Sequence, residues 1–219
     1  MKQLFFSLLL LIVIKTASAQ TTTGRVTYKM DISSDNPDMA MATTMMDGSV
    51  MDLFFSPDKS KMSMTLGMFM TMNTVVDVKA DKSLMLMEVM GNKSAIETKL
   101  SELAKDAKKE DTKIETTTET KEIIGFKCKK AILKTEDGVE MIMWYTTDLI
   151  AALEGFQQFN TKGINGVPLE FATEQQGLKM HFTATKFEKT VDEKIFSLTI
   201  PEGYTLMSLD DLKNMSGEE

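Results

Sequence analysis

The sequence has few of the side chains on which most enzyme and metal-site chemistry depends. Its 219 residues include one His, one Cys and one Trp, and only 7% are aromatic. A nucleophile–base pair needs two suitable groups in contact, and a His or Cys metal cage needs three or four ligands. The composition therefore predicts a protein that is not an enzyme, with no catalytic residues, no cofactor and no metal site built from His or Cys.

The two scarce reactive residues have plain structural interpretations. Cys128 has no second Cys to pair with, so no internal disulfide stabilises the fold. It lies in an alternating run, which favours a small buried side chain over a reactive thiol. His181 lies in a strand-like run without suitable partner residues, and we predict a structural or surface role. The face predicted to carry Cys128 consists of Ile124, Phe126, Cys128, Lys130 and Ile132.

The longest apolar run stands at the N-terminus. Residues 4–14 are apolar except for Ser7, follow Lys2 and precede the small residues Ala17-Ser18-Ala19. This run is too short for a membrane-spanning helix, which needs about 20 residues. The pattern predicts a cleaved signal peptide over 1–19 and one exported domain over 20–219. No Cys follows the run, so we predict a periplasmic or secreted protein that is not a lipoprotein.

The charge balance argues against nucleic acid as a partner. The net charge is −7, and removal of Lys2 and Lys15 leaves 23 basic and 32 acidic residues, a net charge of −9. An acidic surface repels the phosphate backbone, and the sequence has no basic patch with interleaved aromatic residues.

Short runs of alternating hydrophobicity follow one another along most of the chain. Asp81-Lys82, Asp137-Gly138 and Gln176-Gly177 are typical of hairpin turns between them. This spacing predicts an α+β, mostly β protein with a meandering antiparallel sheet. The Thr-rich stretch 112–120 is predicted as an edge strand. The other predicted strands are 24–32, 50–56, 61–72, 74–78, 83–90, 121–134, 139–146, 167–173 and 179–187.

Two or three helices are predicted to accompany the sheet. Ser94 and Glu97 have the spacing of a capping box, followed by apolar residues at helical spacing, which predicts a helix over 94–109. Residues 148–159 and 208–215 are weaker helix candidates.

Methionine is the most unusual feature of the composition. Of the 19 Met residues after the predicted signal peptide, 14 lie between Met30 and Met90. Many occupy every second position, and Met39, Met41 and Met45 are also separated by even numbers of residues. Met side chains are flexible and polarizable, and they form adaptable apolar surfaces. The predicted ligand-binding residues are Met62, Met64, Leu66, Met68, Met70 and Met72 on one strand face, with Met85 and Met87 on another.

Three interpretations of these methionines stay open. They could form an ordinary packed core, as in a structural or interaction module of the cell envelope. They could line a cavity for a lipid or another hydrophobic small molecule, which is the function we predict. They could also bind Cu(I), a soft metal that suits thioethers. Same-face thioethers of one strand lie about 6.6–7 Å apart, too far for one ion unless the chain bends, as near Met45-Met46 or Met68-Met70.

Three segments of the second half carry a family resemblance. Residues 121–131 (KEIIGFKCKKA), 143–149 (MWYTTDL) and 166–171 (GVPLEF) follow each other in the order found in an exported bacterial family, the domain-of-unknown-function 4412 group. The chain also resembles the related GLPGLI proteins, although residues 166–169 depart from that string.

The resemblance implies a fold but no reaction. The family is similar in architecture to the LolA and LppX carriers, which implies an unclosed, curved antiparallel half-barrel with helices on its concave side. The carriers of that architecture hold lipid or acyl chains. A peripheral contact with the cell envelope and the oligomeric state are left open.

Overall fold

The twelve strands of the computed structural model, which describes residues 20–106, 113–134, 140–153, 156, 163–175 and 177–211, belong to one open, curved sheet. The predicted mostly β class and antiparallel half-barrel are confirmed. The strands are β1 (Gly24–Ser33), β2 (Val50–Phe55), β3 (Lys59–Leu66), β4 (Met70–Asp77), β5 (Lys82–Val89), β6 (Asn92–Thr98), β7 (Lys113–Ile123), β8 (Phe126–Lys134), β9 (Glu140–Thr146), β10 (Val167–Gln175), β11 (Leu178–Glu188) and β12 (Thr205–Met207). The short helices are η1 (Pro37–Met39), α1 (Ala40–Met45), α2 (Leu100–Asp106) and η3 (Glu193–Phe196).

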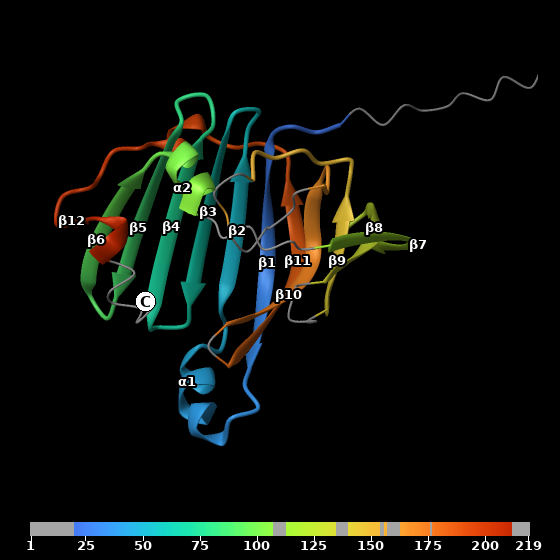
Figure 1. Ribbon diagram of the computed structural model, residues 1–219, viewed down its shortest axis with the longest axis horizontal. Helices are drawn as coiled ribbons and strands as arrows, with labels where there is room; N and C mark the ends of the chain where they lie inside the picture. Colours follow the sequence, from blue (N-terminus) through green and yellow to red (C-terminus); the bar gives the residue numbers. More distant parts are fainter. Residues whose placement is uncertain are drawn as a thin grey trace, which may run out of the picture.

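Two antiparallel meanders meet at the middle of the sheet. Strands β1 to β6 follow each other on one side, and β7 to β11 follow each other on the other (Figure 1). Strand β1 pairs with β11 along its length and so joins the two meanders. At the far edge, β12 pairs with β6 in the parallel direction. The predicted edge strand at 112–120 is confirmed as β7.

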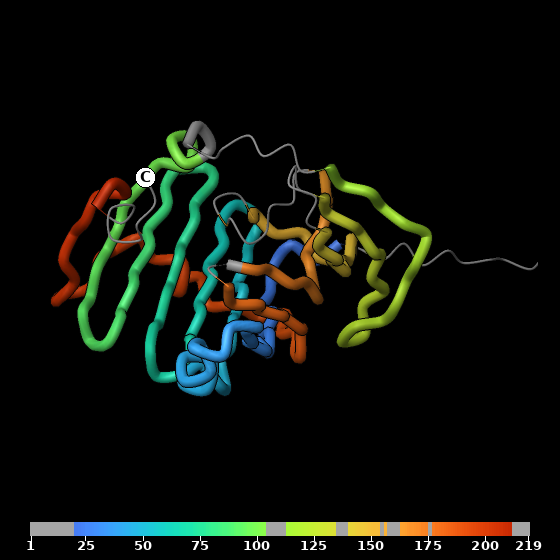
Figure 2. Tube along the Cα trace, turned by 60° about the horizontal axis from the view of Figure 1, so that its bottom comes forward, coloured from blue at the N-terminus to red at the C-terminus, as the bar shows by residue number. Residues whose placement is uncertain are grey.

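The sheet has an apolar inner face and a polar outer face. Side chains of both meanders meet in one apolar cluster, so the sheet curves around its inner face. Leu100 of α2 packs against this cluster, as do Leu149, Leu153 and Phe156 of the chain after β9. The tilted view shows α2 and the segment leading to β12 on opposite sides of the β3–β5 strands (Figure 2).

An aromatic group on the inner face connects the two meanders. Tyr28 is completely buried, and its hydroxyl donates a 2.7 Å hydrogen bond to the carbonyl oxygen of Pro168. Its ring meets the edge of Phe171 at 6.1 Å between ring centroids, and Phe171 stacks on Phe182 at 4.5 Å. Burial raises the pKa of Tyr28 well above its usual value, so the phenol stays a hydrogen-bond donor.

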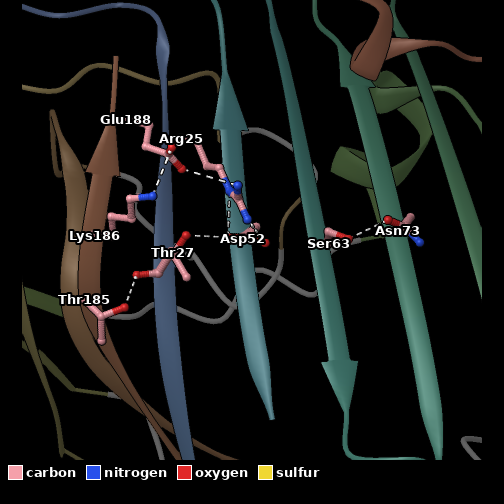
Figure 3. Close-up of polar contacts among 8 residues, drawn as sticks. All are labelled: Arg25, Thr27, Asp52, Ser63, Asn73, Thr185, Lys186 and Glu188. Atoms are coloured by element: carbon pink, nitrogen blue, oxygen red, sulfur yellow. Dashed lines mark hydrogen bonds and ion pairs between the residues drawn. The ribbon is translucent and has the colours of Figure 1, made fainter. Parts of the chain in front are cut away.

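Ion pairs and hydrogen bonds cover the outer face near β1. Arg25 contacts both carboxylate oxygens of Asp52, at 3.0 and 2.8 Å, and lies 3.3 Å from Glu188 (Figure 3). Thr27 donates to the same Asp52 carboxylate at 2.6 Å. Such a two-point contact fixes the planes of both groups, so it orients β1 against β2.

A second, smaller apolar layer lies on the outer face of β4 to β6. Val75, Leu84 and Ala95 alternate with inner-face residues, yet they are buried. The η3 turn contacts β3 and β4, and its Phe196 is also buried. The chain after β11 therefore crosses and covers this part of the outer face before it reaches β12.

Several predicted elements differ from the observed ones. The predicted strand 61–72 is a hairpin, with β3 ending at Leu66 and β4 beginning at Met70. The predicted strand 121–134 is also a hairpin, which turns at Ile124-Gly125, where both residues have positive φ. The buried residues of β8 are Cys128, Ala131 and Leu133, which do not all alternate. The prediction that Ile124, Phe126, Cys128, Lys130 and Ile132 share one face was therefore wrong.

The helix predictions were less accurate than the strand predictions. Residues 94–98 belong to β6, so the predicted capping box was wrong, and the helix begins only at Leu100. Residues 148–153 are not helical, and most of the remaining candidate to 159 lies outside the described residues. Residues 209–211 are helical, and the rest of the predicted tail helix lies outside them, as does the predicted signal peptide. Met41 and Met45 lie on helix α1 and not on a strand.

A glycine substitution in the β3–β4 turn can test how closely α1 packs on the sheet. A Cβ at Gly67 would lie 1.9 Å from the backbone oxygen of Met45, whereas a Cβ at Gly91 would meet nothing within 4 Å. Both glycines have positive φ. Gly91→Ala should therefore cost about 1 kcal/mol of unfolding free energy from backbone strain alone. Gly67→Ala should cost about 1–3 kcal/mol more, measured by urea unfolding. Equal losses would show that α1 does not contact this turn in solution.

Candidate functional site

Seven of the eight predicted ligand-binding residues share the inner face of the first meander. Met62, Met64 and Leu66 are buried there, with exposures of 2%, 6% and 8%. Met70, Met72, Met85 and Met87 are half-buried on the two following strands. Met68 is the exception, because it lies in the β3–β4 turn and is 93% exposed. Its predicted place on the same strand face was wrong.

The strand register aligns four methionines across four neighbouring strands. Met51 of β2 stands opposite Met64 of β3, which stands opposite Met72 of β4, which stands opposite Met87 of β5. We call these four residues the methionine row. Facing side chains of paired strands have Cβ atoms about 4.5–5.5 Å apart. The sequence pattern did not include Met51 in the site, because only the pairing of β2 with β3 brings it there.

The inner face of strands β1 to β6 carries no charged side chain. The Asp, Glu, Lys and Arg residues of these strands all occupy the alternate, outer positions of the paired strands. Burial along the methionine row decreases from the fully buried Met51 to the half-buried Met87. The inner face therefore continues from the closed core to a partly open apolar surface over β4 and β5.

Hydroxyl groups gather at one end of this surface. Ser60 and Thr74 are buried, and neither hydroxyl has a hydrogen-bond partner among the residues that the structure describes. Ser83 is also buried, and it stands on β5 opposite Val76, which in turn stands opposite Ser60. A buried hydroxyl without a partner costs about 1–3 kcal/mol. The inner face thus offers hydrogen bonds at the β3–β4 end opposite Gly67, next to the methionines.

A small cleft lies elsewhere on the sheet. Its volume is about 160 Å³, below the range of about 300–1,000 Å³ that is usual for small-molecule sites. It is lined by Asp31, Ile32, Ser33, Ala172, Lys179, Met180 and His181. None of the predicted ligand-binding methionines borders it, so we do not place the site there.

The family-like segments of the second half form structural contacts. Lys121 lies 4.4 Å above the Trp144 ring and 2.7 Å from the Glu170 carboxylate. His181 is on the outer side of this group, 3.8 Å from Glu170. Cys128 is buried, and burial raises the pKa of its thiol from 9.0 to about 11. The predicted burial of Cys128 is confirmed.

Within the described residues, no three His, Cys, Asp or Glu side chains come together in a way that could hold a metal ion. The described helices are also all too short or too polar to cross a membrane.

A comparison with known protein families identifies the family of this chain. Residues 37–204 match the family described as Domain of unknown function (DUF4412). The chain belongs to this family. The family resemblance predicted from the three segments of the second half is thereby confirmed. None of the curated proteins matches the sequence.

The two solved structures of PNGF-II show the same type of fold at low sequence identity. PNGF-II in a C2 crystal form is 18% identical, with a TM-score of 0.52 over 90% of this chain and 32% of its own chain. The P21 form of PNGF-II gives 17% identity and a TM-score of 0.51, over 89% and 33% of the two chains. This DUF4412 chain thus spans about a third of the PNGF-II chain. An uncharacterized conserved protein from Thermus thermophilus is 10% identical, with a TM-score of 0.44, over 86% and 91%.

Alanine substitutions of Met64 and Met68 can test where these two predicted site residues lie. Met64→Ala should lower the unfolding free energy by about 2–4 kcal/mol, because it removes a buried side chain and leaves a cavity. Met68→Ala should change it by less than about 0.5 kcal/mol, since that side chain is in solvent. Urea unfolding of both variants measures the difference. A large loss from Met68→Ala would place that residue in the core and contradict the observed turn.

The raised pKa of Cys128 has a measurable consequence at high pH. The folded protein keeps the thiol proton up to about pH 11, while the unfolded chain loses it near pH 9. The stabilising contribution is therefore complete below pH 9 and is lost as the pH rises toward 11. Between pH 8 and pH 10.5 the unfolding free energy should fall by on the order of 1–2 kcal/mol more in the wild type than in Cys128→Ala. Parallel pH profiles for the two proteins would show that the thiol is not buried.

Proposed function

We propose that this DUF4412 protein is an exported, non-catalytic binding protein for an uncharged hydrophobic ligand, such as a lipid with a neutral polar group. The ligand would lie on the inner face over β4 and β5, against Met70, Met72, Met85 and Met87. One observation carries this proposal: the inner face of β1 to β6 is free of charge and passes from a closed core to half-buried methionines.

Apolar burial would provide the binding free energy. Each buried Met contributes about 1.5–3 kcal/mol relative to an exposed one, and these four are only partly covered. A soluble protein gains stability when such a surface is covered by a ligand. The flexible thioether side chains would adapt to chains of different length and shape.

The polar groups of the face favour a neutral ligand over an ionised one. Ser60 and Thr74 can each donate one hydrogen bond to an ester, hydroxyl or carbonyl oxygen. The described inner face of β1 to β6 offers no cation to a carboxylate or phosphate. An ionised group would lose its hydration there without a counter-charge, which costs several kcal/mol.

The curved, unclosed sheet supports this proposal, because it is the architecture that the LolA-like resemblance implied. A carrier role of the LolA type and export by a cleaved signal peptide are parts of the proposal. The tightly buried Met51, Met62 and Met64 favour a competing function, a structural or interaction module whose inner face is simply a packed core. The two functions differ in whether the half-buried end takes up a ligand.

Ligand uptake can be measured with a neutral and an ionised probe of equal chain length. We expect monopalmitoylglycerol to bind at least ~10-fold more tightly than palmitate at pH 8, measured by equilibrium partition and mass spectrometry of the intact protein. The double variant Met72→Asp/Met87→Asp should abolish uptake, because it places two charges on the inner face.

The control variant is Thr71→Asp/Leu86→Asp, which alters the same two strands at the outer, half-buried positions facing away from the site. It should bind monopalmitoylglycerol as the wild type does. Absence of uptake by the wild type would leave the packed-core module as the function. Equal loss in both variants would show that the effect comes from strand stability and not from the inner face.

A further inference from the structure

We propose that the methionine row also forms a site for one soft monovalent ion, Cu(I), bound by the thioether sulfurs of Met64, Met72 and Met87. This proposal does not rest on the apolar ligand, because Cu(I) binding depends on sulfur and not on apolar area, although the two sites share Met72 and Met87. The three residues come from β3, β4 and β5 and stand in one line across the sheet.

The register removes the geometric objection to a thioether site. Along one strand, same-face side chains are about 6.6–7 Å apart, too far to share an ion. Across the sheet the strands are only about 4.8 Å apart, and facing Cβ atoms are about 4.5–5.5 Å apart. Each Met has three rotatable bonds, so sulfurs from neighbouring strands can turn toward a common point. Met64, Met72 and Met87 are consecutive neighbours in this direction.

The chemistry of the surroundings selects the ion. The row lies on a face without carboxylates or imidazoles, and three neutral thioethers suit a soft ion such as Cu(I) over Zn²⁺ or Mg²⁺. A single positive charge also costs less to place near an apolar surface than a double one. Binding releases no proton, since a thioether has none to lose.

The burial pattern provides both a rigid side and an entrance. Met64 is 6% exposed and is held by the core, whereas Met72 and Met87 are half-buried and reachable from solvent. Met51 continues the row but is completely buried beneath the core, so we do not include it among the ligands. An ion would approach over β5 and meet the fixed sulfur of Met64 last.

The experiment uses the protein without its signal peptide, Cu(I) kept reduced by excess ascorbate, and the chromogenic chelator bicinchoninate as competitor. We expect one Cu(I) per chain, with an affinity that changes less than about 3-fold between pH 6 and pH 8, because no ligand titrates. Met64→Leu/Met72→Leu/Met87→Leu should weaken binding at least ~100-fold. Met72→Leu/Met87→Leu, which leaves the core residue unchanged, should weaken it in the same direction and guards against a folding defect.

The matched control replaces three methionines at the turn end of the sheet. Met45→Leu/Met68→Leu/Met90→Leu removes the same number of thioethers from exposed positions, and it should bind Cu(I) as the wild type does. Cys128→Ser should also keep the ion, because Cys128 belongs to the other meander. Binding that survives in the row variants, that disappears in the turn variant, or that is absent from the wild type would overturn the proposal.

Separate measurements of Cu(I) binding and lipid uptake distinguish this proposal from the apolar-ligand function. Leu keeps the apolar area of Met but has no sulfur, so loss of Cu(I) from the row variants reports on the thioethers and not on the apolar surface. Loss of Cu(I) binding in the row variants supports the metal site, whether or not the wild type takes up monopalmitoylglycerol. A wild type that binds Cu(I) but no lipid would reject the proposed function alone.

Discussion

The candidate site depends on an unbroken pairing register across the five antiparallel strand pairs of the first meander. From β1 to β6, every paired residue has a single partner on the next strand, without a bulge in any of the five ladders. Since side chains alternate between the faces, this register sends all charges outward and the methionines inward. A slip of one residue in a ladder would turn charged residues such as Lys61, Asp77 or Glu88 toward the inner face. The inner face of β1 to β6 has no side chain of opposite charge to pair with them. The outer-face contacts of Arg25, Asp52, Ser63 and Asn73 hold the same register from the other side.

The second constraint is the junction of the two meanders. Strand β1 pairs on one side with β2 and on the other with β11, and its Tyr28 reaches across to the backbone of β10. The ladder to β11 contains a bulge after Thr27, which increases the local twist. The junction therefore bends the sheet where the two apolar faces must meet. It also explains why burial is greatest near β1 and decreases toward β5, so that the open part of the inner face lies far from the junction.

The strands and most turns follow from the sequence, because alternation and turn residues are local signals. The hairpin at residues 61–77 shows where local signals fail. Leu66 pairs with Met70 across a three-residue turn, so the residues on either side of it keep the same parity. The alternating methionines are therefore compatible with both one long strand and a hairpin. The two structures differ only in the position of Met68, which a hairpin places in the turn. The helix prediction for residues 94–98 failed for a related reason. Ser94 and Glu97 have the spacing of a helix cap, but they are strand residues because they pair with Met87 and Leu84. Tertiary pairing overrode the local pattern.

The site itself was predictable in composition but not in geometry. Sequence alone identified methionines that share a face, and seven of the eight predicted residues do so. It could not show which methionines face each other, because cross-strand neighbours are set by register, and it missed Met51 for that reason. This distinction has chemical consequences. The affinity for an apolar ligand depends on the apolar area of a face, which the order of residues along a strand already determines. A coordinated ion responds to the distance between sulfurs on different strands, which only the assembled sheet determines. The methionine row is thus a property of the fold and not of the order of residues along the chain.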